Sequence, residues 1–196
     1  MNTLDNFIIQ DYLKKDLPYH PTWGEEVIYY YSPQVTFREI PDEISLTIPT
    51  LCYNHCSKDC NSKFCWIENW KEKKEELTGN AFANLLKENP GITCVTFMTS
   101  TNFYQLRGYF WYIKANHPNI KTALYIGQNL DYLLKYRDFC ELNFENIDYI
   151  KVGAFDKNFG PLDNPNTNQR FYKINHLCKG KDKFENITDK FLQKPI

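Results

Sequence analysis

The sequence has almost no net charge. Its 23 lysines and arginines against 24 aspartates and glutamates leave a formal charge of −1, with a pI of about 6.4. Proteins that bind nucleic acid through its phosphates usually carry a clear basic excess. The balance of charges therefore predicts no nucleic-acid partner.

Long apolar runs and a secretion signal are also missing. No stretch approaches the roughly 20 apolar residues that cross a bilayer, and Asp5 and Asp11 interrupt the region where a signal peptide would be apolar. We therefore expect a cytoplasmic protein without a membrane partner. In a reducing compartment, cysteines serve metal or redox chemistry rather than disulfides, so the seven cysteines are informative.

The pattern of apolar residues predicts an α/β protein with a mainly parallel sheet. Residues 1–34 read as an N-terminal extension, and residues 35–196 as one domain. The charged run 71–76 is typical of a solvated helix face or a linker, and 158–171 of a turn-rich loop. Strands alternate with helices from residue 92 onward, which favours parallel pairing. The predicted strands cover 35–40, 44–48, 92–98, 122–127 and 149–153, and the predicted helices lie around 81–86, 103–116, 130–139 and 188–192.

Four cysteines lie close together after the predicted strand 44–48. They are Cys52, Cys56, Cys60 and Cys65. The first three are spaced four residues apart, so three thiolates on one tight loop could hold three irons of a cubane cluster. The fourth iron would then be open to a small molecule. Ligands of parallel α/β sheets gather at the carboxyl ends of the strands, which is where this loop begins.

Two other interpretations of the cysteines remain open. A structural zinc site could use four of the residues Cys52, His55, Cys56, Cys60 and Cys65, although the paired C-x2-C knuckles usual in such sites are missing. The remaining possibility is a set of inert buried thiols, which we predict for Cys94, Cys140 and Cys178.

Several stretches of the chain together resemble one family. The sequence is similar to the activating proteins of anaerobic (class III) ribonucleoside-triphosphate reductase, which belong to the radical S-adenosylmethionine superfamily. The similarity extends from about Val35 to Leu192 and is carried by residues 37–46, 48–66, 91–98, 121–123, 148–153 and 162–172, the last reading Leu-Asp-Asn-Pro-Asn-Thr-Asn-Gln-Arg-Phe-Tyr.

The resemblance implies a fold, cofactors and partners. The fold would be a partial (β/α) barrel. A [4Fe–4S] cluster would bind S-adenosylmethionine and cleave it to a 5′-deoxyadenosyl radical, which generates a glycyl radical on the reductase. The implied partners are the large subunit of the reductase and an electron donor such as flavodoxin. Because the cofactors carry the chemistry, no protein side chain is expected to be catalytic.

The resemblance also assigns the site residues, with two departures. The family spaces its cysteines C-x3-C-x2-C, whereas here Asp59 occupies the third position and Cys60 follows it. Cys52, Cys56 and Cys60 would be the cluster ligands, with Cys65 as the alternative third ligand. After the strand ending at Met98 the family has Gly-Gly-Asp or Gly-Gly-Glu, where this chain has Thr99-Ser100-Thr101.

The cofactor pocket would be lined by Asp59, Asn61, Thr99 and Ser100. The hydroxyls of Thr99 and Ser100 could bind the methionyl ammonium, but more weakly than a carboxylate. The two departures favour the alternative function: a degenerate, catalytically inactive family member that binds a reductase or holds a structural metal.

Overall fold

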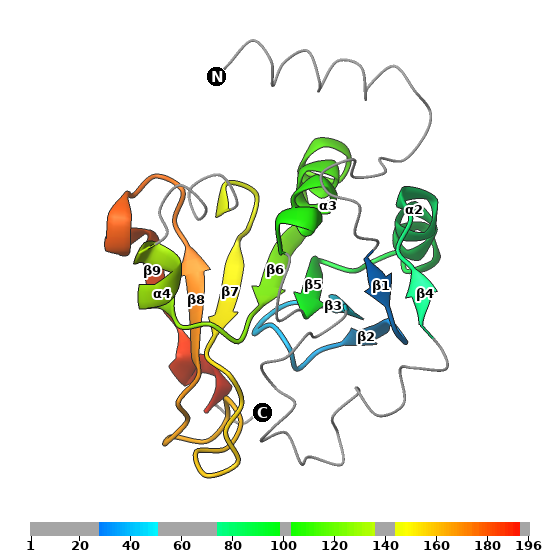
Figure 1. Cartoon of the computed structure of the whole chain (residues 1–196). Coiled ribbons are helices and arrows are strands. Elements are labelled where there is room, and N and C mark those ends of the chain that lie inside the picture. Colours follow the sequence, from blue (N-terminus) through cyan, green and yellow to red (C-terminus); the bar gives the residue numbers. More distant parts are fainter. Residues whose placement is uncertain (1–27, 51–73, 99–102, 136–143, 193–196) are drawn as a thin grey trace.

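The central element of the structure is a mixed seven-stranded sheet. The computed structural model describes residues 28–50, 74–98, 103–135 and 144–192 (Figure 1). Within these ranges the strand order is β2-β3-β5-β6-β7-β8-β9. The strands are β2 (Gln34–Thr36), β3 (Ser45–Pro49), β5 (Cys94–Met98), β6 (Lys121–Tyr125), β7 (Tyr149–Val152), β8 (Arg170–Ile174) and β9 (Phe184–Asn186).

Parallel pairing is confined to the four central strands. β3, β5, β6 and β7 are parallel neighbours, whereas β2, β8 and β9 add to the edges in antiparallel fashion. The sheet does not close within the described residues, since β2 and β9 end the strand order. The expected parallel arrangement is therefore present at the centre, and the antiparallel edges β8 and β9 were not expected.

One face of the sheet, here called the outer face, packs against three helices. These are α2 (Gly79–Glu88), α3 (Phe103–Asn116) and α4 (Leu130–Lys135). Their buried side chains form one apolar cluster with alternate residues of the central strands, including Leu46, Ile48, Val95, Phe97, Leu124, Ile150, Phe82, Phe110 and Leu133. The central strands thus follow one another in chain order, and within the described residues these three helices lie on one face.

The opposite face, here called the inner face, has a smaller apolar cluster over β6 and β7. It consists of Ile40, Cys94, Ala123, Tyr149, Leu162 and Phe171, with Tyr125, Ile187 and Phe191 packed against it. Two segments outside the central strands supply part of this cover. They are residues 37–43, between β2 and β3, and the short 3-10 helix η3 (Thr188–Phe191), which lies where a final helix was predicted. A second 3-10 helix, η2 (Gly180–Lys183), precedes β9.

A small second sheet pairs β1 (Tyr29–Tyr30) with β4 (Glu75–Glu76). The prediction of a solvated helix face or linker for 71–76 is therefore wrong at its described end. Two glutamates can form a strand there because the main chain of β1 supplies the hydrogen bonds, and the Tyr30 hydroxyl donates to Glu75 Oε2 at 2.8 Å. In the part of the chain that is described, no helix is long and apolar enough to cross a membrane.

Candidate functional site

The carboxyl edge of the parallel strands brings two distant segments together. β3 and β5 pair in register, with Pro49 opposite Met98. One residue on, the amide of Thr50 donates to Met98 O at 2.8 Å and its Oγ1 donates to the same oxygen at 3.0 Å. The segment that contains Cys52 therefore begins beside the segment that contains Thr99, at the edge where parallel sheets place their ligands.

Hydroxyl side chains line the inner face of β3 and β5. Since Leu46 and Ile48 belong to the outer-face cluster, Ser45 and Thr47 lie on the inner face. Ser45 Oγ and Thr96 Oγ1 are hydrogen-bonded at 2.5 Å. Thr47 is only 6% exposed, yet its Oγ1 has no hydrogen-bond partner within the described ranges. A buried polar atom without a partner costs free energy and calls for a physical explanation.

A buried lysine lies on the inner face near the carboxyl end of β7. Lys151 is 9% exposed, and its Nζ donates to Gly153 O at 2.6 Å. When the Gln169 amide is oriented with its oxygen toward the neighbouring donors, Oε1 accepts from Lys151 Nζ at 2.7 Å and from the Phe155 amide at 3.2 Å. Gln169 is itself 4% exposed. Main-chain and amide oxygens therefore hold this ammonium in place at the carboxyl edge.

Glu39 and Tyr125 lie close to this lysine. The Tyr125 hydroxyl donates to the main-chain oxygen of Glu39, and Lys151 Nζ lies 5.9 Å from the centroid of the Tyr125 ring. Burial raises the pKa of the Glu39 carboxyl, and the hydrogen bond from Tyr125 and the charge of Lys151 only partly oppose it. Burial also raises the pKa of Tyr125 well above its ordinary value. Both groups therefore resist ionisation.

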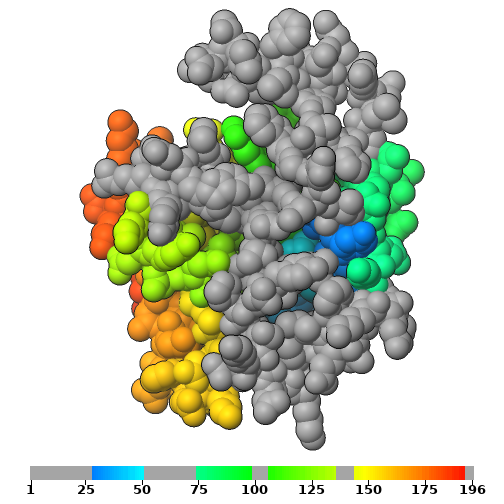
Figure 2. Space-filling model, in the orientation of Figure 1, coloured from blue at the N-terminus to red at the C-terminus, as the bar shows by residue number. Residues whose placement is uncertain are grey.

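The loop between β7 and β8, residues 153–169, is built from local hydrogen bonds. Figure 2 shows it, yellow to orange, at the lower left of the molecule. Gly153 begins it with φ of +91°, and a Cβ there would lie 3.1 Å from Asn168 O. A side chain at this position would thus be strained and crowded. Thr167 and Gln169 are buried, and the Asn168 side chain donates to Ala154 O at 2.9 Å, so the two ends of the loop are tied together beside Lys151.

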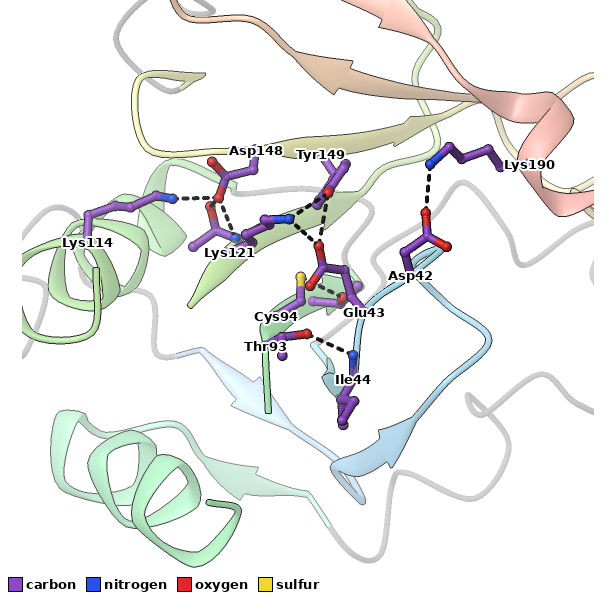
Figure 3. A network of polar contacts seen from close by, with 12 residues as sticks. Asp42, Glu43, Ile44, Thr93, Cys94, Lys114, Lys121, Asp148, Tyr149 and Lys190 are labelled. Atoms are coloured by element: carbon purple, nitrogen blue, oxygen red, sulfur yellow. Dashed lines mark hydrogen bonds and ion pairs between the residues drawn. The ribbon is translucent and has the colours of Figure 1, made fainter. Parts of the chain in front are cut away.

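The amino edge of the same strands holds a different polar network (Figure 3). Lys121 Nζ contacts Glu43 Oε1 at 2.5 Å, and the Tyr149 hydroxyl donates to the same oxygen at 3.1 Å. The hydrogen bond with Glu43 raises the pKa of Lys121, and burial raises the pKa of Tyr149 to about 12. These shifts keep the lysine charged and the tyrosine neutral.

Asp148 is the second centre of the amino-edge network. Its Oδ2 accepts from Lys114 Nζ at 2.5 Å and from the Thr122 amide at 2.7 Å. The Thr122 hydroxyl donates to Asn146 O and lies 3.3 Å from the same carboxylate. Asp148 therefore joins helix α3 to strands β6 and β7.

All residues that the sequence assigned to the cofactors lie outside the described residues. They are Cys52, Cys56, Cys60, Asp59, Asn61, Thr99 and Ser100, together with the alternative ligand Cys65. Within the described ranges, no group of three His, Cys, Asp or Glu side chains could hold a metal ion. The assignments of the cluster and of the methionyl contacts therefore stay predictions.

Two of the thiols predicted to be inert can be placed. Cys94 is fully buried, and burial raises its pKa to about 12, so it stays a protonated thiol. Cys178 is a free thiol but partly exposed, so the prediction that it is buried is wrong. It lies in the connection between β8 and η2. Cys140 lies outside the described residues.

Sequence reasoning did not single out the inner-face residues Thr47 and Lys151, whereas the segment of Gln169 was expected to cover the site or to meet the reductase. A signal for Lys151 was present, because a lysine within an otherwise apolar buried strand needs partners. Thr47 gave no signal, since a threonine in a strand is ordinary.

Comparison of the chain with protein-family models, with curated proteins and with solved structures gave no match. The family resemblance therefore rests on the sequence stretches described above.

Proposed function

We propose that this protein is an iron–sulfur, S-adenosylmethionine-dependent activase that generates a glycyl radical on anaerobic ribonucleotide reductase. The proposal joins the resemblance in sequence to a sheet whose parallel strands follow chain order with helices on one face. That winding favours a partial barrel, in which ligands bind at the carboxyl edge.

The observation that carries the proposal is the contact between Thr50 and Met98. These residues immediately precede the cysteine segment and the Thr99-Ser100 segment, and they are hydrogen-bonded. A cluster ligand loop and a methionyl-binding turn must meet around one small molecule. Adjacent carboxyl ends of neighbouring parallel strands provide that proximity, although the two segments are about fifty residues apart in sequence.

The described part of the site fits a polar cofactor. The inner face beside these strand ends carries Thr47 on β3, whose buried hydroxyl has no partner within the described residues. The buried cation of Lys151 lies on β7, with β5 and β6 between the two. Cys52, Cys56 and Cys60 would hold the cluster. The side chains of Asp59, Asn61, Thr99 and Ser100 would contact S-adenosylmethionine.

When bound, the cluster would supply the electron that cleaves the sulfonium of S-adenosylmethionine. The chain's own contribution is to orient the cofactor and to exclude water and oxygen from the inner face. The reductase large subunit would present its glycine at the carboxyl edge, and a donor such as flavodoxin would reduce the cluster.

The test is production of 5′-deoxyadenosine by the full chain reconstituted anaerobically with iron and sulfide, reduced, and given S-adenosylmethionine. We expect product from the native chain and none from Cys56→Ala. Cys178→Ala is the matched control, since it removes a partly exposed thiol that is not a proposed ligand. Failure of the native chain to bind a cluster would overturn the proposal.

A second candidate function is that of a catalytically inactive relative which binds a reductase or holds a structural metal. Thr99-Ser100-Thr101 in place of Gly-Gly-acid favours it, because both the close backbone approach that glycine allows and the negative charge are lost. A protein that binds a cluster without producing 5′-deoxyadenosine, or that binds zinc instead, would support this function.

A further inference from the structure

We infer that the loop between β7 and β8, residues 153–169, is the docking surface for the reductase large subunit, with Phe159 as its apolar anchor. This inference rests on the proposed function and names the part of the chain that its protein partner would contact. It starts from two observations: the position of the loop, and the hydrogen bonds that hold Phe159 at the surface.

The loop lies at the edge of the sheet where the radical would form. β7 runs in the same direction as β3, β5 and β6, so the loop that follows Val152 begins at the same edge as Thr50 and Met98. Figure 1 shows it, yellow to orange, extending beyond the carboxyl ends of β6 and β7. A folded partner cannot enter the sheet, so it has to lie across this edge to bring a glycine to the proposed site. Such a partner would contact the loop.

Phe159 is the large apolar residue that the loop exposes. It is 45% exposed, whereas Leu162 is 8% exposed and belongs to the inner-face cluster. A single exposed apolar side chain is common on protein surfaces, but this one is set apart by its support. The Phe159 and Gly160 amides donate to Asp156 O at 3.0 and 2.9 Å, and Thr167 Oγ1 donates to Gly160 O at 3.3 Å. The ring is therefore presented on a turn that is already formed, so binding would not have to order it.

Gly160 fixes the direction of that turn. Its φ is +76°, a conformation that side chains disfavour, and a Cβ there would lie 2.6 Å from Asn164 Nδ2. Asn164 is itself held in place, because its amide donates to Pro161 O at 3.0 Å and its Oδ1 accepts from the Asn166 amide at 2.9 Å. A substitution at Gly160 thus alters the shape of the loop while Phe159 is kept.

The side chains around Phe159 indicate the kind of surface that it fits. Most of them are uncharged, and the two charges among them have opposite signs. Between residues 157 and 166, the other exposed residues are Lys157, Asn158, Pro161, Asp163, Pro165 and Asn166. The matching surface of the reductase would be an apolar pocket with a rim of uncharged hydrogen-bonding groups. Binding should therefore depend only weakly on salt concentration.

The test measures equilibrium binding of the purified reductase large subunit to the full chain loaded anaerobically with its cluster. Phe159→Ala should weaken binding roughly ten- to thirtyfold, because an aromatic anchor is lost from its pocket. The matched control is Leu177→Ala, which should bind within about twofold of the native chain. Leu177 is 95% exposed but lies in the connection between β8 and η2, at the amino edge. Gly160→Ala keeps Phe159 but strains the turn, and it should weaken binding at least about threefold.

A second readout separates docking from an effect on the cofactor site. Without the reductase, Phe159→Ala should produce 5′-deoxyadenosine as fast as the native chain does. With the reductase, glycyl-radical formation is followed by electron paramagnetic resonance. Its rate should be lower at limiting reductase and recover at saturating reductase. A rate that stays low at saturation would overturn the inference, because the substitution would then act on the chemistry rather than on docking.

The outcomes separate the inference from the proposed function. If the native chain produces no 5′-deoxyadenosine but binds the reductase through Phe159, the proposed activity is overturned and the docking surface stands. If it produces 5′-deoxyadenosine and Phe159→Ala binds the reductase equally well, the inference alone is overturned. A native chain that does not bind the reductase overturns the inference, and the proposed function as well if it produces no 5′-deoxyadenosine. Equal weakening in Leu177→Ala, or unchanged binding in Gly160→Ala, also overturns the inference.

Discussion

The two edges of the parallel strands hold polar groups in different ways. At the amino edge, Glu43, Lys121 and Tyr149 contact one another, and Asp148 accepts from two elements at once. At the carboxyl edge, Lys151 is held by neutral oxygens, and farther along the inner face Thr47 has no partner within the described ranges. A network complete within the protein stabilises the fold, whereas the buried Thr47 hydroxyl leaves a hydrogen bond unmade in the described part of the chain.

Removing Asp148 should have the largest effect at the amino edge. We expect Asp148→Ala to lower the free energy of unfolding by about 2–4 kcal/mol, because the buried Thr122 amide and the Lys114 ammonium both lose a charged acceptor. Urea unfolding measures the change. Asp131→Ala, which breaks the highly exposed pair with Lys181, is the control and should change little.

A decrease in the free energy of unfolding of less than about 1 kcal/mol in Asp148→Ala would show that the amino-edge network does not stabilise the fold. The same variant, loaded with its cluster, should bind S-adenosylmethionine as the native chain does, since the residue lies at the opposite edge from the proposed site.

Removing Glu43 should have a smaller effect. Its side chain is 5% exposed, but its partner Lys121 is 48% exposed and can regain water when the carboxylate is lost. We therefore expect Glu43→Ala to cost about 2 kcal/mol, chiefly from the Tyr149 hydroxyl left without its acceptor. The double variant Glu43→Ala with Tyr149→Phe should be destabilised by less than the sum of the two single variants. If the losses of the two single variants added up to the loss of the double variant, the hydrogen bond between Tyr149 and Glu43 would not contribute to stability.

The smallest expected effect is a change of stability with pH. It should have opposite signs for Glu39 and Asp42, which lie close together in sequence. The pKa of Glu39 is raised by burial, so folding favours its protonated form, and its contribution to stability is lost as pH rises from about 4.5 through the folded pKa. The pKa of Asp42 is lowered by its hydrogen bond with Lys190. Its contribution is therefore present above about 3.8 and lost as pH falls through the folded pKa.

Urea unfolding of Glu39→Gln and Asp42→Asn between about pH 3 and 7 would measure how the free energy of unfolding of each variant changes with pH. Relative to the native chain, Glu39→Gln should gain stability as pH rises. Asp42→Asn should lose a small amount of stability at neutral pH and approach the native value in acid. Equal slopes for the two variants would show that Glu39 is more solvated than its contacts indicate.

Much of the central fold could be predicted from the sequence. The β-branched run 92–98 and the apolar spacing of 103–116 correspond to β5 and α3, because local pattern and burial agree there. The strands β4 and β8 could not be predicted. Glu75 and Glu76 have no strand propensity and depend on pairing with β1, and Arg170–Ile174 begins directly after a turn-rich segment.

The candidate site was less predictable than the fold. The cysteines and the Thr99-Ser100 segment gave strong compositional signals, but they lie outside the described residues. The groups that can be described, such as Lys151 and Gln169, are 18 residues apart in sequence and are brought together by the loop between β7 and β8. Long-range contacts of this kind leave no local pattern in a single sequence.

The short helix η3 covers part of the inner face. The rings of Phe191 and Phe171 lie 5.0 Å apart, and the Phe171 amide donates to Thr188 Oγ1 at 2.9 Å. The inner-face cluster is therefore complete only when residues 188–191 pack on β8. Local detachment of η3 would expose Phe171, and chaperones that bind apolar surface would meet the chain in that state.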